Sequence, residues 1–394
     1  MKNKEIKWLY FMEVFSGLAR GSYLVCIGWT TLVISNNVAT VGQIFIVASM
    51  TNFLAGPIVG VIIDRYKRKK LIILSHFYIA ISILLLAGFI FFVQNLSILW
   101  LFGTVIIVNI FRLIYWGAFD GLIRESVENE DILHIVARTR TIHLFSTAAG
   151  TAAIGLIIDR FSTGHGFFVT AAASVFLMIV AGFITDGFVK TNARGIAGFW
   201  FDLKSGFEIF RNSKLIQTVA LLSVVALPIG QLSNSLLSSF IRDDLGEGSD
   251  LFGFVDAAWP VGGMLAAALL SKKIKNLNVK NGEYFLAIMA GVSTIVLSYS
   301  TESLSLAIAH GFMGFFVWMC RIIIAGRVLE LCQNENVGRT RIYIEAMISV
   351  SAMIMSLSPT LIVLEATASY FFYWGFFVVI SAVLLWFWKI RQTI

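Results

Sequence analysis

Five ionisable side chains stand inside long apolar stretches of the sequence, where a charge needs a reason. They are Glu13, Arg20, Arg112, Asp256 and Arg321. If these stretches cross a membrane, each charge costs at least about 2.5–3.5 kcal/mol on insertion scales. An arginine guanidinium holds a carboxylate through two parallel hydrogen bonds and stays charged when it is poorly hydrated. The three arginines therefore predict a binding site for an anionic small molecule.

The two carboxylates predict a different chemistry. An apolar environment disfavours the charged form of a carboxyl group, so Glu13 is our first candidate for proton coupling and Asp256 our second. Glu13 precedes Arg20 by seven residues, which places both on one helix face roughly 10 Å apart, too far for direct contact. A structural alternative stays open for each arginine and for Asp256, in which the side chain pairs with a neighbouring helix and tethers it.

A stripe of polar side chains occupies a later apolar stretch. Its members are Gln231, Asn234, Ser235 and Ser238. Their spacings of three and four put them on one face of a continuous helix, and such a face is expensive against lipid. We expect Gln231 and Asn234 to face substrate. Trp116 and Trp318 lie close to Arg112 and Arg321 in sequence and are candidates for apolar walls of the same site.

The elements that must position these residues are membrane-spanning helices. Hydrophobic residues make up 58% of the 394-residue chain and charged residues 13%, against about 45–50% and about 25% in soluble domains. A span needs about 20 mainly apolar residues. We place twelve spans, at residues 8–34, 38–63, 70–93, 96–119, 135–158, 165–188, 215–240, 250–271, 282–300, 303–326, 341–363 and 367–388.

Lysine and arginine residues gather in alternate loops between these spans, and the opposite loops hold only Arg160 and Arg242. By the positive-inside rule, this asymmetry predicts a multi-pass protein with both termini in the cytoplasm. It also accounts for the net charge of +7 without a nucleic-acid partner.

The sequence predicts no enzyme, no cofactor and no metal site. The three cysteines are scattered, and the histidines lack the i, i+4 pairing of a metal site. No phosphate-binding loop of the Gly-x-x-x-x-Gly-Lys form occurs. Paired catalytic carboxylates and a nucleophile constellation are also missing from the sequence pattern. The expected partners are a small-molecule substrate, protons and the lipid bilayer.

A polar connection divides the spans into two sets of six. In residues 191–214, apolar side chains alternate with charged ones, which favours an amphipathic helix on the cytoplasmic surface. The predicted organisation is an N-terminal six-helix bundle over residues 1–190, this linker at 191–214, and a C-terminal six-helix bundle over 215–394. Two such halves are typical of parallel repeats about a central cavity.

The segment from Gly60 to Lys70 carries the most specific motif, Gly-Val-Ile-Ile-Asp-Arg-Tyr-Lys-Arg-Lys-Lys. It resembles the loop between the second and third helices of the major facilitator superfamily. The resemblance implies an all-α integral membrane protein of twelve transmembrane helices in two six-helix bundles. It further implies that helices one, four, seven and ten line a central cavity. The residues that it implies for a cytoplasmic gate are Gly60, Asp64, Arg65 and Arg68.

Two departures from the family pattern bear on mechanism. Lys67 stands where many members have glycine, and the stretch from Gly150 to Gly155 lacks the proline of the antiporter motif. The missing proline argues against drug/proton antiport. Arg112 and Gly117 match the motif of the fourth span, whose arginine the resemblance implicates in proton coupling.

Within the superfamily, the stretch from Asp64 to Ile72 is similar to enterobactin-type siderophore exporters and macrolide efflux pumps. We therefore expect a monomeric secondary transporter of the cytoplasmic (inner) membrane that works by alternating access. Its expected substrate is an anionic metabolite, first a carboxylate-type siderophore, exported in a proton-coupled manner. A multidrug or macrolide-type efflux pump for hydrophobic or cationic compounds, a siderophore importer of the same fold and a lipid flippase are the alternatives.

Overall fold

The chain is helical throughout the part that the computed structural model describes, which is residues 2–93, 96–126, 132–184, 195–273, 282–332 and 334–393. No strand occurs among these residues. The helices of the first half are α1 Lys2–Ser35, α2 Val38–Arg65, α3 Arg68–Phe92, α4 Ile98–Ser126, α5 Ile132–Arg160 and α6 Thr163–Gly182. The later helices are α7 Gly195–Asn212, α8 Lys214–Ala226, α9 Ile229–Ser239, α10 Ser249–Lys273, α11 Gly282–Tyr299, α12 Ser303–Leu331, α13 Asn334–Leu361 and α14 Thr367–Thr393. The predicted all-α fold is confirmed.

Twelve helical segments of the described residues are long and apolar enough to cross a membrane. They coincide with the twelve predicted spans to within a few residues at most ends, and α7 is not among them. Length and apolar composition therefore locate the spans, because a bilayer accepts only chain segments that satisfy their own backbone hydrogen bonds.

The seventh span is not the single continuous helix that the polar stripe suggested. It consists of α8, α9 and a π-helical turn, Phe240–Asp244, with a break at Leu227 and Pro228. Proline has no N–H to donate and its ring clashes with the preceding turn, so the helix ends before it and begins again after it. All members of the predicted stripe lie in α9.

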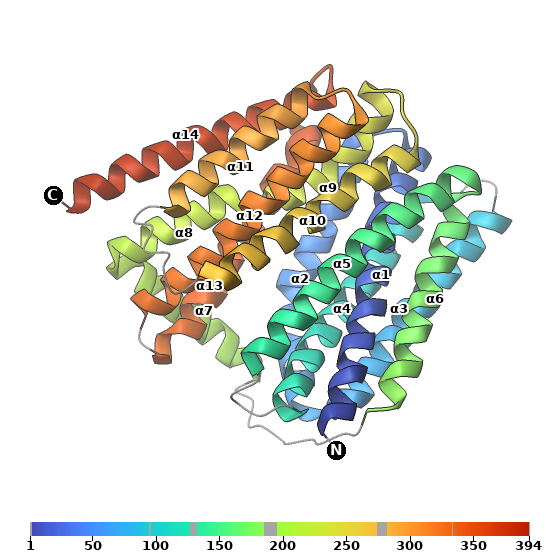
Figure 1. Cartoon of the computed structure of the whole chain (residues 1–394), viewed down its shortest axis with the longest axis horizontal. Coiled ribbons are helices and arrows are strands. Elements are labelled where there is room, and N and C mark those ends of the chain that lie inside the picture. The colour runs from blue at the N-terminus through green and yellow to red at the C-terminus, as the bar shows by residue number, and fades with distance from the viewer. Residues whose placement is uncertain are drawn as a thin grey trace. The chain divides into compact units, whose positions relative to one another are not determined.

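The chain divides into two compact units. Unit 1 comprises residues 1–40, 47–196 and 248–257, and unit 2 comprises 41–46, 197–247 and 258–394. Within unit 1, α1 packs against α5 and α6, and α3 packs against α4 and α6 (Figure 1). Within unit 2, α11 packs against α12 and α14. The predicted domain boundaries at 190 and 214 stay predictions.

Glycines let α1 and α5 approach closely inside unit 1. A Cβ on Gly17 would collide with the His143 carbonyl oxygen, and one on Gly21 would collide with the Thr147 carbonyl oxygen. Small residues at such positions are how membrane helices gain close van der Waals contact. The approach brings Glu13, one turn before Gly17, beside the fifth helix.

The amphipathic segment of the polar connection forms α7 and packs within unit 2. Phe207 and Phe210 lie against the Tyr343 ring of α13, and Arg339 Nε lies 3.3 Å from Asp202 Oδ1. Residues 185–194, which include the start of the predicted linker, lie outside the described residues.

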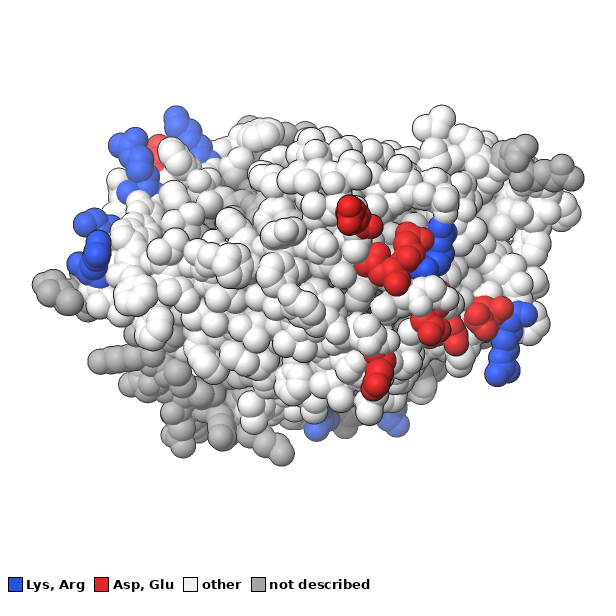
Figure 2. Space-filling view, turned by 90° about the horizontal axis from the view of Figure 1, so that it is seen from above, with Lys and Arg blue, Asp and Glu red and all other residues white. Residues whose placement is uncertain are grey.

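The outer surface is suited to lipid. The face drawn in Figure 2 is mostly uncharged, and its lysine, arginine, aspartate and glutamate side chains stand in small groups. Large apolar side chains are exposed on many helices, for example Phe92 of α3, Leu265 of α10 and Phe387 of α14. A soluble protein rarely exposes this much apolar surface, whereas a multi-pass membrane protein needs it.

Candidate functional site

A cavity inside unit 1 gathers polar side chains from five helices. It has about 400 Å³ of empty space, including the open space at its mouth. Its polar and aromatic lining includes Arg20 and Tyr23 of α1, His76 of α3, Arg112 and Tyr115 of α4, and His143 of α5. Of the predicted substrate-binding residues, Arg20, Arg112 and Trp116 all line this cavity. Residues from distant parts of the sequence thus meet at one place.

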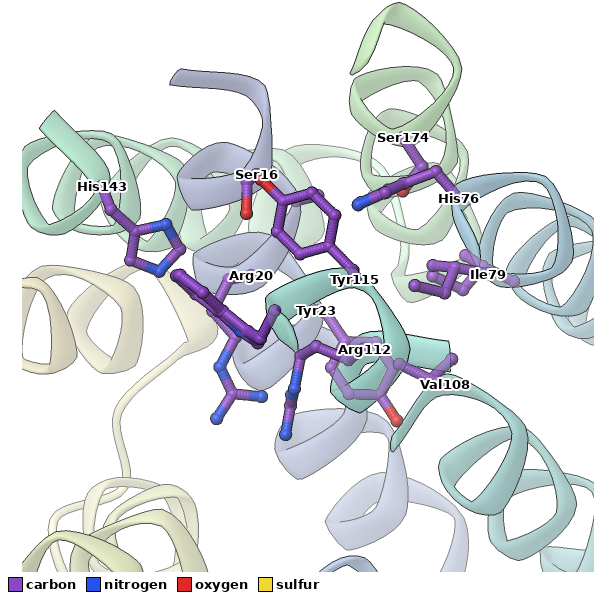
Figure 3. Close-up of a pocket in the computed structure, with 13 residues that line it drawn as sticks. Ser16, Arg20, Tyr23, His76, Ile79, Val108, Arg112, Tyr115, His143 and Ser174 are labelled. Carbon is purple, nitrogen blue, oxygen red and sulfur yellow. The ribbon is translucent and has the colours of Figure 1, made fainter. Parts of the chain in front are cut away.

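The two arginines are oriented alike. In Figure 3 the guanidinium groups of Arg20 and Arg112 point in the same direction. Arg112 Nη2 donates a hydrogen bond to Asn109 Oδ1 at 2.6 Å, while its buried Nη1 has no hydrogen-bond partner among the described residues. Asp256 belongs to the same unit and lies within electrostatic range of Arg20. Arg112 therefore has donor capacity left for an anion.

A second cluster surrounds Glu13, which is fully buried. His143 Nδ1 lies 2.9 Å from Glu13 Oε2, close enough for an ion pair when the imidazole is protonated. Tyr115 Oη donates to Glu13 Oε1 at 3.2 Å. His143 and Tyr115 also line the cavity, so both residues that contact the Glu13 carboxylate are exposed to the cavity. Carboxylate and imidazole are the groups that exchange protons in transport proteins.

Trp116 forms one wall of the cavity and lies between His143 and Arg140. Its ring stands edge-on to His143, with 4.8 Å between centroids, and Arg140 Cζ lies 4.2 Å over the ring centroid. Arg140 is itself 2.7 Å from Asp120 Oδ1. The indole is therefore fixed by contacts on both sides, and it lines the cavity. Its role in binding substrate stays a prediction.

The predicted gate motif ties the start of α3 to its neighbours. Arg68 is buried, donates to the Ile63 carbonyl, and places Nε 3.5 Å from Glu125 Oε1 at the end of α4. Arg65 is exposed at the end of α2, and a Cβ on Gly60 would meet open space. The Asp64 side chain lies outside the described residues.

Lys69 adds a further tie, because its Nζ donates to the carbonyls of Gly182 at 2.6 Å and Ile184 at 2.7 Å. The basic motif therefore holds the ends of α2, α4 and α6 together.

Two members of the polar stripe of α9 make hydrogen bonds to other segments of unit 2, and the buried Ser238 Oγ has no partner among the described residues. Gln231 Nε2 donates to the Phe45 carbonyl at 3.0 Å, and Ser235 Oγ donates to Ser356 Oγ at 2.8 Å. Asn234 is partly buried. These contacts favour a structural role for part of the stripe.

Arg321 and Trp318 lie in unit 2. Arg321 is exposed and places Nη2 2.9 Å from Glu345 Oε1, while Trp318 lies over Gly263 of α10. Of the three arginines that the sequence singled out, Arg321 is the one whose contacts favour the structural alternative. No group of three or more metal-ligating side chains occurs in the part of the chain that the structure describes.

His76 and the partnership of Glu13 with His143 were not predicted. His143 stands 130 residues after Glu13 in the sequence. Spacing within one helix cannot reveal a pair formed by two helices. The signal in the sequence was the presence of a histidine in an apolar span, which is too common to name a partner.

Comparison with known proteins agrees with this architecture. Residues 9–356 match the family model described as Major Facilitator Superfamily. An uncharacterized MFS-type transporter, YfiS of Bacillus subtilis (strain 168), is 24% identical over 280 residues, which are 70% of this chain and 64% of that protein.

Solved structures with this architecture include two transporters. A point mutant of the nucleoside transporter NupG superposes with a TM-score of 0.82 at 13% identity, covering 96% of this chain and 98% of that one. A point mutant of the peptide transporter POT gives 0.79 at 11% identity, covering 98% and 94%. At such identities the likeness establishes the fold alone, and the predicted fold of two six-helix bundles is confirmed.

Proposed function

Because the chain belongs to the Major Facilitator Superfamily, we propose that it is a secondary transporter that carries a small organic anion across the membrane by alternating access. One observation carries the proposal. Arg20 and Arg112 line a single cavity and point their guanidinium groups the same way (Figure 3), with one buried donor of Arg112 unpaired among the described residues. Two guanidinium groups that face the same way are suited to a carboxylate or another anionic oxygen group.

The surroundings strengthen this site. Asn109 accepts from Arg112 and so fixes the direction of that guanidinium before a substrate arrives. Ile79, Ile83 and Val108 give the cavity apolar walls, which keep water out and make each charge–charge interaction stronger than in bulk solvent. A preformed, mostly apolar pocket with a few fixed polar groups is what small-molecule sites require.

Proton coupling is assigned to Glu13 and His143. A proton shared between the carboxylate and the imidazole, 2.9 Å apart, is lost or gained with little rearrangement of the helices. Because His143 also lines the cavity, the charge of the pair affects an anion bound there. Asp256 is the second candidate, since it lies within electrostatic range of Arg20 and competes with a substrate anion for it.

The gate is assigned to the motif at the start of α3. Asp64, Arg65 and Arg68, with Gly60, would close the cytoplasmic side, and the contact between Arg68 and Glu125 supports this role. We further propose that the protein is a monomer in the cytoplasmic membrane with both termini in the cytoplasm.

Within the anion class, the first candidate substrate is a carboxylate-type siderophore, exported with proton coupling or, alternatively, imported. A second candidate function is efflux of cationic or hydrophobic drugs. It is favoured by the Trp116 ring, which already holds the guanidinium of Arg140 at 4.2 Å and could hold a cationic drug in the same way.

Transport in proteoliposomes under an imposed pH gradient distinguishes these functions. A citrate-based siderophore and a lipophilic cationic dye are tested in parallel on the wild type, Arg20→Gln and Arg112→Gln, with exposed Arg160→Gln as the matched control. We expect the siderophore to move and both cavity variants to lose it while Arg160→Gln does not. If only the dye moves, and its transport is unchanged in the arginine variants, the protein is a drug pump and the proposal of an anion carrier is wrong.

A further inference from the structure

His76 is a buried histidine that projects into the same cavity. Its side chain is 4% exposed, and neither ring nitrogen has a hydrogen-bond partner among the described residues. The imidazole stands edge-on to Tyr115, with 4.7 Å between ring centroids and 89° between ring planes. The contact holds the imidazole in a fixed orientation against the Tyr115 ring.

Such an arrangement is unusual for a histidine that serves packing alone. A neutral imidazole carries one N–H donor and one acceptor nitrogen, and buried groups of this kind nearly always find partners. His310 of unit 2 illustrates the ordinary case, because its Nε2 lies 2.7 Å from Ser233 Oγ. The Tyr115 hydroxyl donates its proton to Glu13, so it is not a donor to His76.

The position of His76 relative to the arginines suggests what it binds. In Figure 3, His76 and Ser174 lie to the right of the Tyr115 ring, and the guanidinium groups of Arg20 and Arg112 lie below it. The cavity therefore offers charge at one end and a neutral hydrogen-bonding group at another. Its other walls are apolar or aromatic.

We propose that His76 determines specificity by hydrogen bonding to a neutral hydroxyl or carbonyl group on the apolar body of an anion whose charged end Arg20 and Arg112 hold. The proposal rests on the anion carrier proposed above and narrows its substrate class to small hydroxylated or oxo-substituted organic acids.

Matched aromatic acids provide the test. Benzoate, 3-hydroxybenzoate and 4-hydroxybenzoate carry the same charge and differ in one hydroxyl group. Their equilibrium binding is measured on the full-length protein in lipid nanodiscs, for the wild type, His76→Phe and His76→Gln. We expect at least one hydroxylated acid to bind roughly five- to tenfold more tightly than benzoate to the wild type, because it satisfies a buried polar group.

The variants separate recognition from folding. His76→Phe keeps the ring shape, so benzoate should bind it as it binds the wild type, while the preference for the hydroxylated acid falls below roughly twofold. His76→Gln keeps a donor and an acceptor and should retain part of the preference. His165→Phe, at the exposed start of α6, is the matched histidine control and should change nothing.

The outcomes distinguish the two proposals. Equal binding of all three acids to the wild type, or a preference that survives His76→Phe, overturns the role of His76 and leaves the anion site standing. Arg20→Gln and Arg112→Gln should each weaken the binding of all three acids by the same factor. If no acid binds the wild type, the anion site fails and the role of His76 fails with it.

Discussion

At the level of single residues, Glu13 explains most about how charge is kept inside this membrane protein. It is fully buried, and His143 and Tyr115 contact its two carboxylate oxygens. Without such partners, a buried carboxylate would destabilise the folded protein by its full desolvation free energy. With them it forms a small polar network inside unit 1.

We expect Glu13→Gln to uncouple transport from the proton gradient. The amide keeps the shape of the side chain and an acceptor for Tyr115, but it cannot titrate. Accumulation driven by a pH gradient should be lost, because the side chain no longer carries a proton between the two states. Substrate exchange without a gradient should persist. Proteoliposome uptake measures both, with exposed Glu302→Gln as the control. Undiminished gradient-driven uptake would exclude Glu13 as the coupling group.

Residue types could be predicted from the sequence better than their partners. Arg20, Arg112 and Trp116 stood out because a charge or an indole in an apolar span needs a reason, and all three line one cavity. The pairing of Glu13 with His143 depends on how far α1 and α5 slide past each other. Hydropathy and helical spacing carry no information on that register.

At the level of helices, the start of α3 shows how a sequence motif becomes a structural joint. Arg68 lies in the first turn of α3, where the helix dipole disfavours a positive charge. Its contacts with the Ile63 carbonyl and with Glu125 compensate for this. Gly121 of α4 leaves the room that the guanidinium occupies, because a Cβ there would lie 2.7 Å from Arg68 Nε.

We predict that Gly121→Val displaces Arg68 and loosens the contact between α3 and α4. Overpacking of this kind costs about 1–3 kcal/mol, so the thermal unfolding midpoint of the purified protein should fall. Gly103→Val is the matched control, because it lies in the same helix and its Cβ would meet open space. Equal midpoints for the two variants would contradict the role of Gly121.

The span boundaries were predictable, whereas the internal structure of the seventh span was not. Apolar length sets where a helix enters and leaves the bilayer, so the predicted ends agree with the structure to within a few residues at most positions. The break at Pro228 went unpredicted because proline is tolerated in membrane helices, as in α2, α10 and α13, each of which contains one without ending there.

At the level of the whole molecule, the two units repeat one packing plan with opposite charges. In unit 1, α3 packs on α4 and α6 and begins with the cation Arg68. In unit 2, α11 packs on α12 and α14 and begins with the buried anion Glu283. Glu283 Oε1 lies 3.2 Å from Lys389 Nζ and 3.8 Å from Arg327 Nε. An anion in the first turn of a helix is also favoured by the helix dipole, which Arg68 opposes.

Because the charge at the start of α11 is opposite to that at the start of α3, we expect substitutions at the two helix starts to change stability differently. We expect Glu283→Gln to lower the free energy of unfolding by about 3 kcal/mol. The substitution removes a buried carboxylate and leaves Lys389 and Arg327 without their common anion. Lys389→Met should cost less, since Arg327 and the helix dipole still stabilise Glu283.

The double variant Glu283→Lys with Lys389→Glu tests the reason. It restores an ion pair of opposite direction but sets a cation at the start of α11 and beside Arg327. Thermal unfolding should therefore show only partial recovery relative to Glu283→Lys alone. Full recovery of the unfolding midpoint would mean that the ion pair alone stabilises the start of α11. The sign of the charge at the start of the helix would then make no contribution to stability.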